Sequence, residues 1–541
     1  MERVAKGRAL ALALFVLAAL AAGAATAQDR SSKAPRVARA VTAGSGGVAI
    51  AACDVSTLQS FAPVDTTIVT AQKLTTPVPY CRADGFLISR NPGPNQVNFM
   101  VALPDDYAGR YYMINSGGNS GFVPNPPANL LSAGYAVAGT DTGNQDRFPV
   151  YTYLSDKAKS LDQAWRGTHL TAVSTQAITK GYYNVPKMFR YAVGCSGGGR
   201  LGLTVATNHP EDFDGVVSGA PGSGVSYPQQ ARIGQYGKLH PDAWISPAQL
   251  AQVDAAVTAK YDATDGAVDG IVWDPSVIKF DDLPAILPFL TQAQLSWIKV
   301  IMSDLKSPDG REPYTGFIFP GYPITQTTAW SQWFMGSLPP DQWSVTSPNP
   351  AAYGFGNAVF RAYFGANFDF VNDFDFTDQS QLDYFMLVHN AYSWPRSTPA
   401  ELLRFNAKGG KIIFYADTSD HGAGYQEFIN LYDDIWRTMG SWGKTRHFAR
   451  LFLAPGTAHC GGGVGPQDVQ PKAFEALVKW VEQGIPPEQL LTSRPTSASL
   501  PARTFLLCPY PEQARYKPSQ GSVNDASAWE CRQYFHPKTN P

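Results

Sequence analysis

The chain has 541 residues, which is enough for several ordinary domains or for one large α/β enzyme with insertions. Its 43 Lys and Arg residues balance 44 Asp and Glu residues, so no net field attracts nucleic acid or an anionic membrane. The charge balance therefore argues against a nucleic-acid partner and favours a neutral or polymeric substrate.

The first 27 residues have the layout of a secretory signal peptide. Basic residues precede an apolar run over residues 9–25, which ends in small residues. An uncleaved membrane anchor is the alternative, because a span needs roughly 20 apolar residues, but the Ala and Gly content favours cleavage. We expect a secreted or periplasmic protein with no membrane association after cleavage, and a disordered leader over residues 28–48.

The six cysteines form an even set, which in an exported chain predicts disulfides. Proximity pairs the first two and the last two cysteines, and it leaves the middle two for each other. The predicted disulfides are Cys53–Cys81, Cys508–Cys531 and Cys195–Cys460. Two buried free thiols are the alternative for the middle pair.

Short β-branched or aromatic runs, each bounded by turn residues, predict strands along the chain. The predicted strands are residues 97–102, 111–115, 135–140, 190–193, 215–218, 411–415 and 450–453. Helices are predicted over residues 161–180 and around 474–481, where apolar residues recur at i, i+3, i+4 and i+7. Strands that alternate with helices predict an α/β fold with a mainly parallel sheet.

Residues 227–398 lie between two predicted strands and are too numerous for a loop, so they are predicted to form an inserted lid subdomain. The catalytic domain would then comprise residues 49–226 and 399–541. The insertion is rich in aromatic residues. Most of them should form its core, and a minority would line a site for a flat aromatic acyl group.

Residues 194–198 read Gly-Cys-Ser-Gly-Gly, the GxSxG spacing of a nucleophile elbow, in which a sharp strand-to-helix turn exposes a serine hydroxyl. Ser196 is therefore the candidate nucleophile, and the N–H of Gly197 is a candidate donor to the oxyanion. A second donor is expected from the glycine-rich loop over residues 115–121. A competing hypothesis takes Cys195 as the nucleophile.

A serine nucleophile needs a general base, and the base needs a carboxylate that orients it. In α/β hydrolases these residues follow the nucleophile in the order acid, then base. His459 is the preferred base, because it follows a predicted strand near the end of the chain and precedes a cysteine; His421 is a secondary candidate. Asp417 and Asp420 both qualify as the acid on spacing, and the alternative role of each is to cap a turn.

Asp262, Asp265 and Asp269 are spaced three and four residues apart among glycines, and oxygen ligands so arranged suit Ca²⁺. The backbone carbonyls of Ala267 and Ile271 would complete the shell. The alternative is an Asp-Gly double turn without a metal. We predict a structural calcium ion that holds the insertion in shape and takes no part in catalysis.

Taken together, these residues resemble the tannase and feruloyl esterase family, which includes the mono(2-hydroxyethyl) terephthalate hydrolases, over residues 53–531. In that family a Cys-Ser pair and a His-Cys pair carry nucleophile and base, and a disulfide joins the cysteines. Residues 195–196 and 459–460 match this pattern. The family's acid ends a stretch Tyr-His-Gly-x-x-Asp, to which residues 415–420 are similar at both ends, and this implies Asp420.

The resemblance further implies an α/β-hydrolase fold with a large inserted lid, and an oxyanion hole formed by Gly118 and Gly197. It also implies that Asp262, Asp265 and Asp269 hold the family's lid calcium ion. The implied substrates are esters of aromatic carboxylic acids: gallates, hydroxycinnamates such as ferulates, or terephthalate monoesters.

We therefore expect a secreted serine carboxylesterase that works through an acyl-enzyme. Two hypotheses compete with it: a secreted serine peptidase of the same fold, and a non-catalytic, calcium-dependent protein that binds phenolics or polysaccharide.

Overall fold

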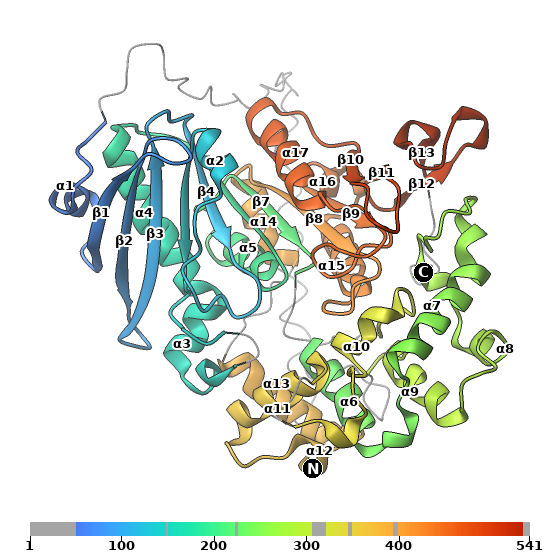
Figure 1. The fold of residues 1–541 in the computed structure, drawn as a ribbon. Coiled ribbons are helices and arrows are strands. Elements are labelled where there is room, and N and C mark those ends of the chain that lie inside the picture. Colours follow the sequence, from blue (N-terminus) through green and yellow to red (C-terminus); the bar gives the residue numbers. More distant parts are fainter. Residues whose placement is uncertain are drawn as a thin grey trace, which may run out of the picture. The chain divides into compact units, whose positions relative to one another are not determined.

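The structure is a computed structural model, shown as a ribbon in Figure 1. It describes residues 50–147, 150–221, 226–305, 321–344, 349–392 and 399–533. The predicted signal peptide and leader lie outside these ranges. The chain divides into two units, and every element below belongs to the unit that comprises residues 39–541.

A mixed sheet of nine strands forms the centre of this unit, in the order β1-β2-β3-β5-β4-β6-β7-β8-β9 (Figure 1). The six strands from β5 to β9 in this order are parallel, and β1, β2 and β3 continue the sheet by antiparallel pairing. The strands are β1 (Thr66–Leu74), β2 (Tyr80–Ser89), β3 (Asn95–Pro104), β4 (Arg110–Asn115), β5 (Tyr135–Thr140), β6 (Phe189–Cys195), β7 (Gly215–Gly219), β8 (Lys411–Asp417) and β9 (Ala449–Ala454).

Each predicted strand coincides with an observed one, from β3 to β9, whereas β1 and β2 were not predicted. β2 does alternate between buried and partly exposed residues, but its outward face carries Arg82 and Asp84, which pair with each other at 2.8 Å. Charged residues dilute the apolar signal of such a strand. The sheet is therefore mixed, with a parallel part that carries the site and an antiparallel part beside it.

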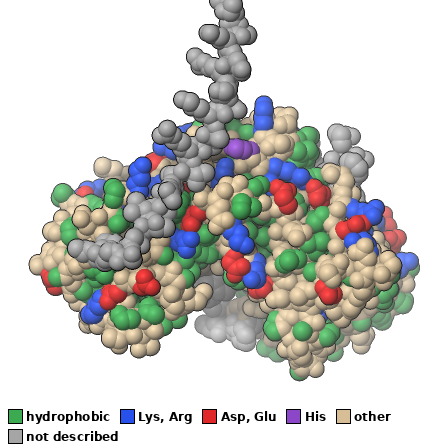
Figure 2. All heavy atoms as spheres, turned by 90° about the horizontal axis from the view of Figure 1, so that it is seen from above, with side chains coloured by type: hydrophobic (Ala, Val, Ile, Leu, Met, Phe, Trp, Pro, Cys, Tyr) green, Lys and Arg blue, Asp and Glu red, His purple; other side chains and the backbone are tan. Residues whose placement is uncertain are grey.

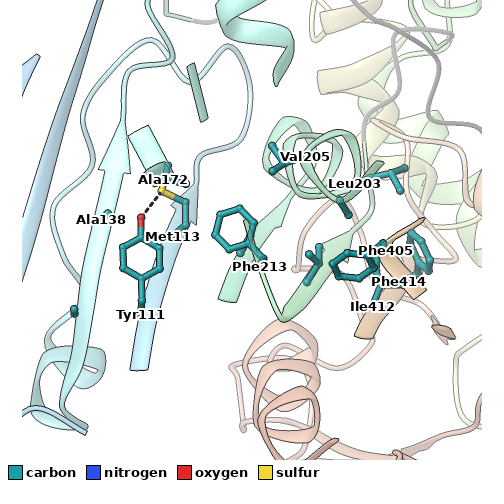
Figure 3. Close-up of a cluster of buried hydrophobic side chains, with 14 of the residues drawn as sticks. Tyr111, Met113, Ala138, Ala172, Leu203, Val205, Phe213, Phe405, Ile412 and Phe414 are labelled. Carbon is teal, nitrogen blue, oxygen red and sulfur yellow. Dashed lines mark hydrogen bonds between the residues drawn. The ribbon is translucent and has the colours of Figure 1, made fainter. Parts of the chain in front are cut away.

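Consecutive residues of β4 enter different cores, because side chains alternate across a strand. Tyr111 and Met113 join the core on one face, where the Tyr111 hydroxyl lies 3.6 Å from the Met113 sulfur (Figure 3), while Tyr112 joins the core on the other face. The first face packs against α4 (Gly167–Tyr183), α5 (Gly197–Asn208), α14 (Pro399–Ala407) and α15 (Tyr425–Met439), and the second against α2 (Ala128–Ser132) and α17 (Val469–Gln483).

The helix predicted over residues 161–180 has an irregular start. It begins as a short helix, α3 (Lys157–Leu161), continues through a π-helical turn (Asp162–Arg166), and only then becomes α4. Asp162 is fully buried and forms an ion pair with Arg166 one turn later, so the turn is part of the packed interior. The helix prediction depended on the amino-acid composition of residues 161–180, and composition does not indicate such an irregular start.

The chain between β7 and β8 forms a helical insertion, although these two strands are neighbours in the sheet. Its helices are α6 (Ser226–Leu239), α7 (Pro247–Tyr261), α8 (Leu283–Ile286), α9 (Gln292–Met302), α10 (Trp330–Trp333), α11 (Ala351–Phe364), α12 (Phe370–Asp373) and α13 (Gln379–Tyr392). Two apolar clusters fill the insertion, one of which also includes Tyr151, Tyr153 and Leu154 from the segment after β5. Trp297, Trp330 and Phe360 are fully buried in these clusters. Many of its aromatic residues therefore form core, in agreement with the prediction.

Two small antiparallel sheets follow α17 near the end of the chain. They consist of β10 (Leu490–Arg494) with β11 (Arg503–Leu507) and β12 (Glu512–Tyr516) with β13 (Trp529–Gln533). The helix α16 (Trp442–Arg446) precedes β9, and α1 (Val55–Phe61) precedes β1.

Charges of both signs are mixed on the surface. Figure 2 shows basic and acidic side chains interspersed with hydrophobic ones on one face. Many of the charges are paired locally, as Arg190 is with Asp214 at 2.7 Å. Among the described residues, no helix is both long and apolar enough to cross a membrane.

Candidate active site

Ser196 lies at the turn between β6 and α5. Its φ is 59°, a conformation that residues with a side chain rarely adopt and that is typical of a strained strand-to-helix elbow. The turn leaves no room for neighbouring side chains: a Cβ on Gly198 would lie 2.0 Å from the carbonyl oxygen of Asn115, and one on Gly199 would lie 2.2 Å from that of Gly219. The glycines thus allow the backbone to turn sharply and leave the serine side chain partly exposed.

Ser196, His459 and Asp420 form one hydrogen-bonded chain. Ser196 Oγ lies 2.8 Å from His459 Nε2, and His459 Nδ1 lies 2.8 Å from Asp420 Oδ2. The other carboxylate oxygen of Asp420, Oδ1, accepts the backbone N–H groups of Gly422 and Ala423 at 2.6 and 2.9 Å. A carboxylate fixed in this way holds the proton of the imidazole on Nδ1, so that Nε2 can accept the serine proton.

The surroundings of His459 favour its role as a base. Burial alone would lower the pKa of His459, but the charge and hydrogen bond of Asp420 outweigh burial and raise the pKa above its usual value. The ring of Trp333 in α10 packs edge-on to the imidazole, with a centroid distance of 5.4 Å. The insertion therefore supplies an aromatic wall directly at the proposed base.

The structure distinguishes the roles of Asp417 and Asp420, which residue spacing alone could not do. Asp417 does not contact the imidazole; its Oδ2 accepts the backbone N–H of Cys460 at 2.9 Å, and its Oδ1 has no hydrogen-bond partner among the described residues. Burial, and then the neighbouring charge of Asp420, raises the pKa of Asp417 well above its usual value. The hydrogen bonds therefore identify Asp420, and not Asp417, as the carboxylate that orients the imidazole.

The competing candidates for base and nucleophile, His421 and Cys195, have other contacts. His421 is fully buried and its Nε2–H donates to the carbonyl oxygen of Thr325 in the insertion at 2.9 Å. Burial lowers the pKa of His421 to about 4, so the ring is neutral near pH 7. Cys195 forms a disulfide with Cys460, which leaves no thiol for the competing hypothesis of a cysteine nucleophile.

All six cysteines are paired, and the pairs are the predicted ones: Cys53–Cys81, Cys195–Cys460 and Cys508–Cys531. The second of these joins residues 265 positions apart, with a Cα–Cα distance of 5.9 Å. Since Cys195 precedes Ser196 and Cys460 follows His459, this disulfide ties the proposed nucleophile and base together covalently.

Replacing both Cys195 and Cys460 with alanine should lower both stability and kcat. The chain-entropy estimate for so long a loop is about 5 kcal/mol, against about 3 kcal/mol for the loop closed by Cys508 and Cys531. Thermal unfolding and ester kinetics of the two double variants would be compared. A loss of kcat that is equal in both double variants would contradict the positioning role of Cys195–Cys460.

Two backbone N–H groups are available beside Ser196. Gly118, in the loop after β4, lies against Gly197, since a Cβ on Gly197 would be 2.4 Å from the oxygen and 3.2 Å from the nitrogen of Gly118. Neither amide donates a backbone hydrogen bond within the described part of the chain. Gly118 has a φ of 58°, which favours glycine. The two predicted donors are thus brought together, and such a pair can stabilise an oxyanion.

Hydrogen bonds connect the insertion to the loops that carry acid and base. Gln230 of α6 donates to the carbonyl oxygen of Gly422 at 2.8 Å, and Thr325 shares a hydrogen bond of 2.9 Å with Ser419. Sequence reasoning missed these contacts and that of Trp333 with His459. The partners in the two hydrogen bonds are 192 and 94 residues apart, so no local pattern could reveal them.

The three predicted calcium ligands lie in one loop at the end of α7, although they are not a group whose ligand atoms all lie within 4.8 Å of one another. Asp262 Oδ1 accepts backbone N–H groups from Asp269 and Ile271, and Ala267 donates its N–H to Asp265 Oδ1 at 2.9 Å. Ala267 and Ile271 are themselves buried. The loop is therefore compact, with its carboxylates turned towards its own backbone.

The charges of this loop fit a bound cation. One guanidinium is paired with the carboxylates: Arg503 Nη2 lies 2.7 Å from Asp269 Oδ2. The Oδ2 atom of Asp265 is buried with no hydrogen-bond partner among the described residues, and burial raises the pKa of Asp265 to about 7. Three buried aspartates opposite one arginine leave negative charge uncompensated, which a divalent cation would neutralise.

A strand-to-helix elbow, followed by an inserted cap and then by the strands that bring acid and base, is the arrangement of α/β hydrolases. Within that class the chain belongs to the tannase and feruloyl esterase family, whose sequence model matches residues 81–532. This membership places the chain among the carboxylic ester hydrolases and confirms the predicted family.

Individual relatives agree over most of the chain. It is 28% identical over 508 residues to an esterase of Xanthomonas campestris pv. campestris, with 84% of each chain covered. It is 26% identical over 527 residues to mono(2-hydroxyethyl) terephthalate hydrolase of Piscinibacter sakaiensis, again with 84% of each covered. The crystal structure of feruloyl esterase B from Aspergillus oryzae matches with a TM-score of 0.74 at 23% identity, covering 89% of this chain and 99% of that one. This last likeness confirms the predicted fold.

Proposed function

We propose that this enzyme is a secreted serine carboxylesterase that hydrolyses esters of aromatic carboxylic acids through an acyl-enzyme. The observation that carries the proposal is the hydrogen-bonded chain from Ser196 through His459 to Asp420. A serine hydroxyl becomes a competent nucleophile near neutral pH when an oriented imidazole can take its proton.

The proposed reaction has two halves. In the first, Ser196 Oγ attacks the ester carbonyl while His459 Nε2 takes the hydroxyl proton, and the resulting oxyanion accepts hydrogen bonds from the amides of Gly118 and Gly197. His459 then donates that proton to the departing alcohol oxygen, and the acyl group remains on Ser196. In the second half, water loses a proton to His459 and attacks the acyl carbonyl, which releases the acid and restores Ser196.

The substrate class follows from family membership and from the aromatic wall beside the base. The terephthalate hydrolase relative and the family's feruloyl esterases act, by their names, on esters of flat aromatic acids. The ring of Trp333, next to His459, offers such an acyl group an apolar face. We propose gallate, hydroxycinnamate or terephthalate monoesters as substrates.

Export is supported by the layout of the first 27 residues and by the three disulfides.

A fluorophosphonate probe and a substrate panel test this proposal together. The probe should label the folded enzyme once, and peptide mapping should locate the label on Ser196. The panel should contain methyl gallate, methyl ferulate, methyl benzoate, a terephthalate monoester and a peptide amide. We expect hydrolysis of aromatic esters without cleavage of the amide. Cleavage of peptides alone would establish a peptidase, and absence of labelling would support a binding protein.

We also propose that the side chains of Asp262, Asp265 and Asp269, with the carbonyls of Ala267 and Ile271, hold a structural calcium ion. The unpartnered oxygen of Asp265 and the excess of carboxylates support the proposal. A bound ion would supply the positive charge that Arg503 alone does not provide, and it would stabilise the insertion where α7 ends.

Removing calcium with a chelator should therefore destabilise the enzyme. When free Ca²⁺ exceeds its Kd a hundredfold, binding stabilises the folded state by about 3 kcal/mol, so chelation should lower the Tm and added Ca²⁺ should restore it. Asp265→Asn should abolish this calcium-dependent shift, whereas Asp281→Asn, an exposed position in the same insertion, should retain it. A Tm that is insensitive to chelation in the unmodified enzyme would refute the site.

A further inference from the structure

A second cluster of potential metal ligands lies at the opposite end of the nucleophile helix from Ser196. His169 is on α4, His209 caps the C-terminus of α5, and Asp212 follows in the loop to β7. One ligand atom from each of the three lies within 4.8 Å of the others, and no other such group occurs among the residues that the structure describes. The twelve residues of α5 span about 18 Å, so this cluster is separate from the active site.

The three side chains are already in contact. His169 Nδ1 donates to Asp212 Oδ2 at 2.7 Å, and the rings of His169 and His209 stack with a centroid distance of 3.4 Å. The ring of Trp165 lies 5.0 Å from that of His209. The histidine side chains are 19% and 21% exposed and that of Asp212 is 5% exposed, so the site is built into the protein yet open to ions from solvent.

Backbone contacts hold Asp212 in place. Its N–H donates to the carbonyl oxygen of His209 at 3.0 Å, and its own carbonyl oxygen accepts a hydrogen bond from Gln176 Nε2 at 2.9 Å. These two contacts fix the backbone of Asp212 and, with it, the carboxylate that faces His169.

We propose that His169, His209 and Asp212 bind a divalent transition-metal ion, with Zn²⁺ the expected occupant. Two imidazoles and one carboxylate are ligands that suit Zn²⁺, and three protein ligands leave a position for water. Glu211 is half exposed, and its carboxylate lies 3.6 Å from His209 Nδ1, close enough to serve as a further ligand. The ion would join α4 to the loop that leaves the nucleophile helix, and it would stabilise the fold without touching substrate.

The alternative is a hydrogen-bonded His–Asp pair beside a stacked histidine, with no ion. Isothermal titration with Zn²⁺, performed on the full enzyme with Ca²⁺ kept in excess, distinguishes the two. We expect saturable binding of one equivalent and an increase in Tm. Co²⁺ should bind at the same site and acquire a visible absorption spectrum that reports nitrogen and oxygen ligands.

Two ligand variants and two control variants locate the ion. His209→Phe keeps a ring stacked between Trp165 and His169 but removes the ligand nitrogens, so it should fold and lose binding. Asp212→Asn should also lose binding, while His240→Ala, an exposed histidine in the insertion, should retain it. His459→Ala should retain it too, which excludes Zn²⁺ uptake at the active site. Ester hydrolysis by the first variant reports that it is folded.

Absence of Zn²⁺ binding by the unmodified enzyme would overturn the proposal and establish the metal-free pair. Equal binding by His209→Phe and the unmodified enzyme would overturn it as well, because the ion would then lie elsewhere.

Discussion

Replacing Ser196 with alanine should lower kcat for aromatic esters by about five to six orders of magnitude. The variant keeps the elbow, the base and the oxyanion donors, but it has no atom that can form the acyl-enzyme. Any residual hydrolysis would come from water activated by His459. Steady-state kinetics would measure the loss, and the fluorophosphonate label should disappear with it.

A matched control for this substitution is Ser174→Ala. Ser174 is buried on α4, where its hydroxyl shares a hydrogen bond of 2.9 Å with Thr66, far along the chain from the site. Loss of this hydrogen bond should lower the free energy of unfolding by about 1 kcal/mol and leave kcat unchanged. The Tm of Ser196→Ala should stay close to that of the unmodified enzyme. Near-normal turnover by Ser196→Ala, with the protein folded, would refute serine catalysis outright.

A local motif predicts the proposed nucleophile, because an elbow and its flanking glycines are formed by consecutive residues. The strain at Ser196 and the close approach of Gly198 to Asn115 explain why that short pattern carries so much structural information. Proximity in the sequence likewise predicts Cys53–Cys81 and Cys508–Cys531, and Cys195–Cys460 then follows by elimination. Residue spacing, by contrast, says nothing about which of two nearby carboxylates turns towards a ring 39 residues away.

Long-range packing is the part that the sequence does not predict. Trp333 contacts His459 across more than a hundred positions, and the cluster of His169 with Asp212 joins a helix to a loop 43 residues later. Both contacts depend on how separate elements meet in space. Strand β2 was missed for a different reason: its partly exposed face carries an ion pair where a strand pattern would show apolar or small polar residues.

Variants of Asp417 and Asp420, at and just after the end of β8, test the proposed site most directly. Asp420→Asn should lower kcat by about four orders of magnitude, because an amide cannot hold the Nδ1 proton of His459 or stabilise the imidazolium that forms during attack. Asp417→Asn should change kcat by less than about tenfold. Burial raises the pKa of Asp417 well above its usual value, and a neutral amide can still accept the N–H of Cys460 through its oxygen. The two variants differ by three positions and have the same change in chemistry, so each controls for the other.

The pH dependence of the same variants separates the two roles again. Catalysis needs neutral His459, and Asp420 raises the pKa of His459, so the acid limb of kcat/KM should lie above pH 6.5, the ordinary value for histidine. Any residual activity of Asp420→Asn should have an acid limb at lower pH, whereas that of Asp417→Asn should stay close to the unmodified enzyme. A large loss of kcat in Asp417→Asn with little effect in Asp420→Asn would reverse the assignment.

Stability provides a further contrast between these two carboxyls. The folded-state pKa of Asp417 is raised above its unfolded value, so between those two pKa values the folded protein binds more protons and the free energy of unfolding falls as pH rises. Asparagine cannot ionise, so Asp417→Asn should gain stability relative to the unmodified enzyme as pH increases through this window. Asp420→Asn instead weakens an acceptor of three hydrogen bonds, so it should lower the free energy of unfolding. Denaturant unfolding of both variants at several pH values would measure the two effects, and a free energy of unfolding of Asp417→Asn that does not rise relative to the unmodified enzyme would contradict the raised pKa of Asp417.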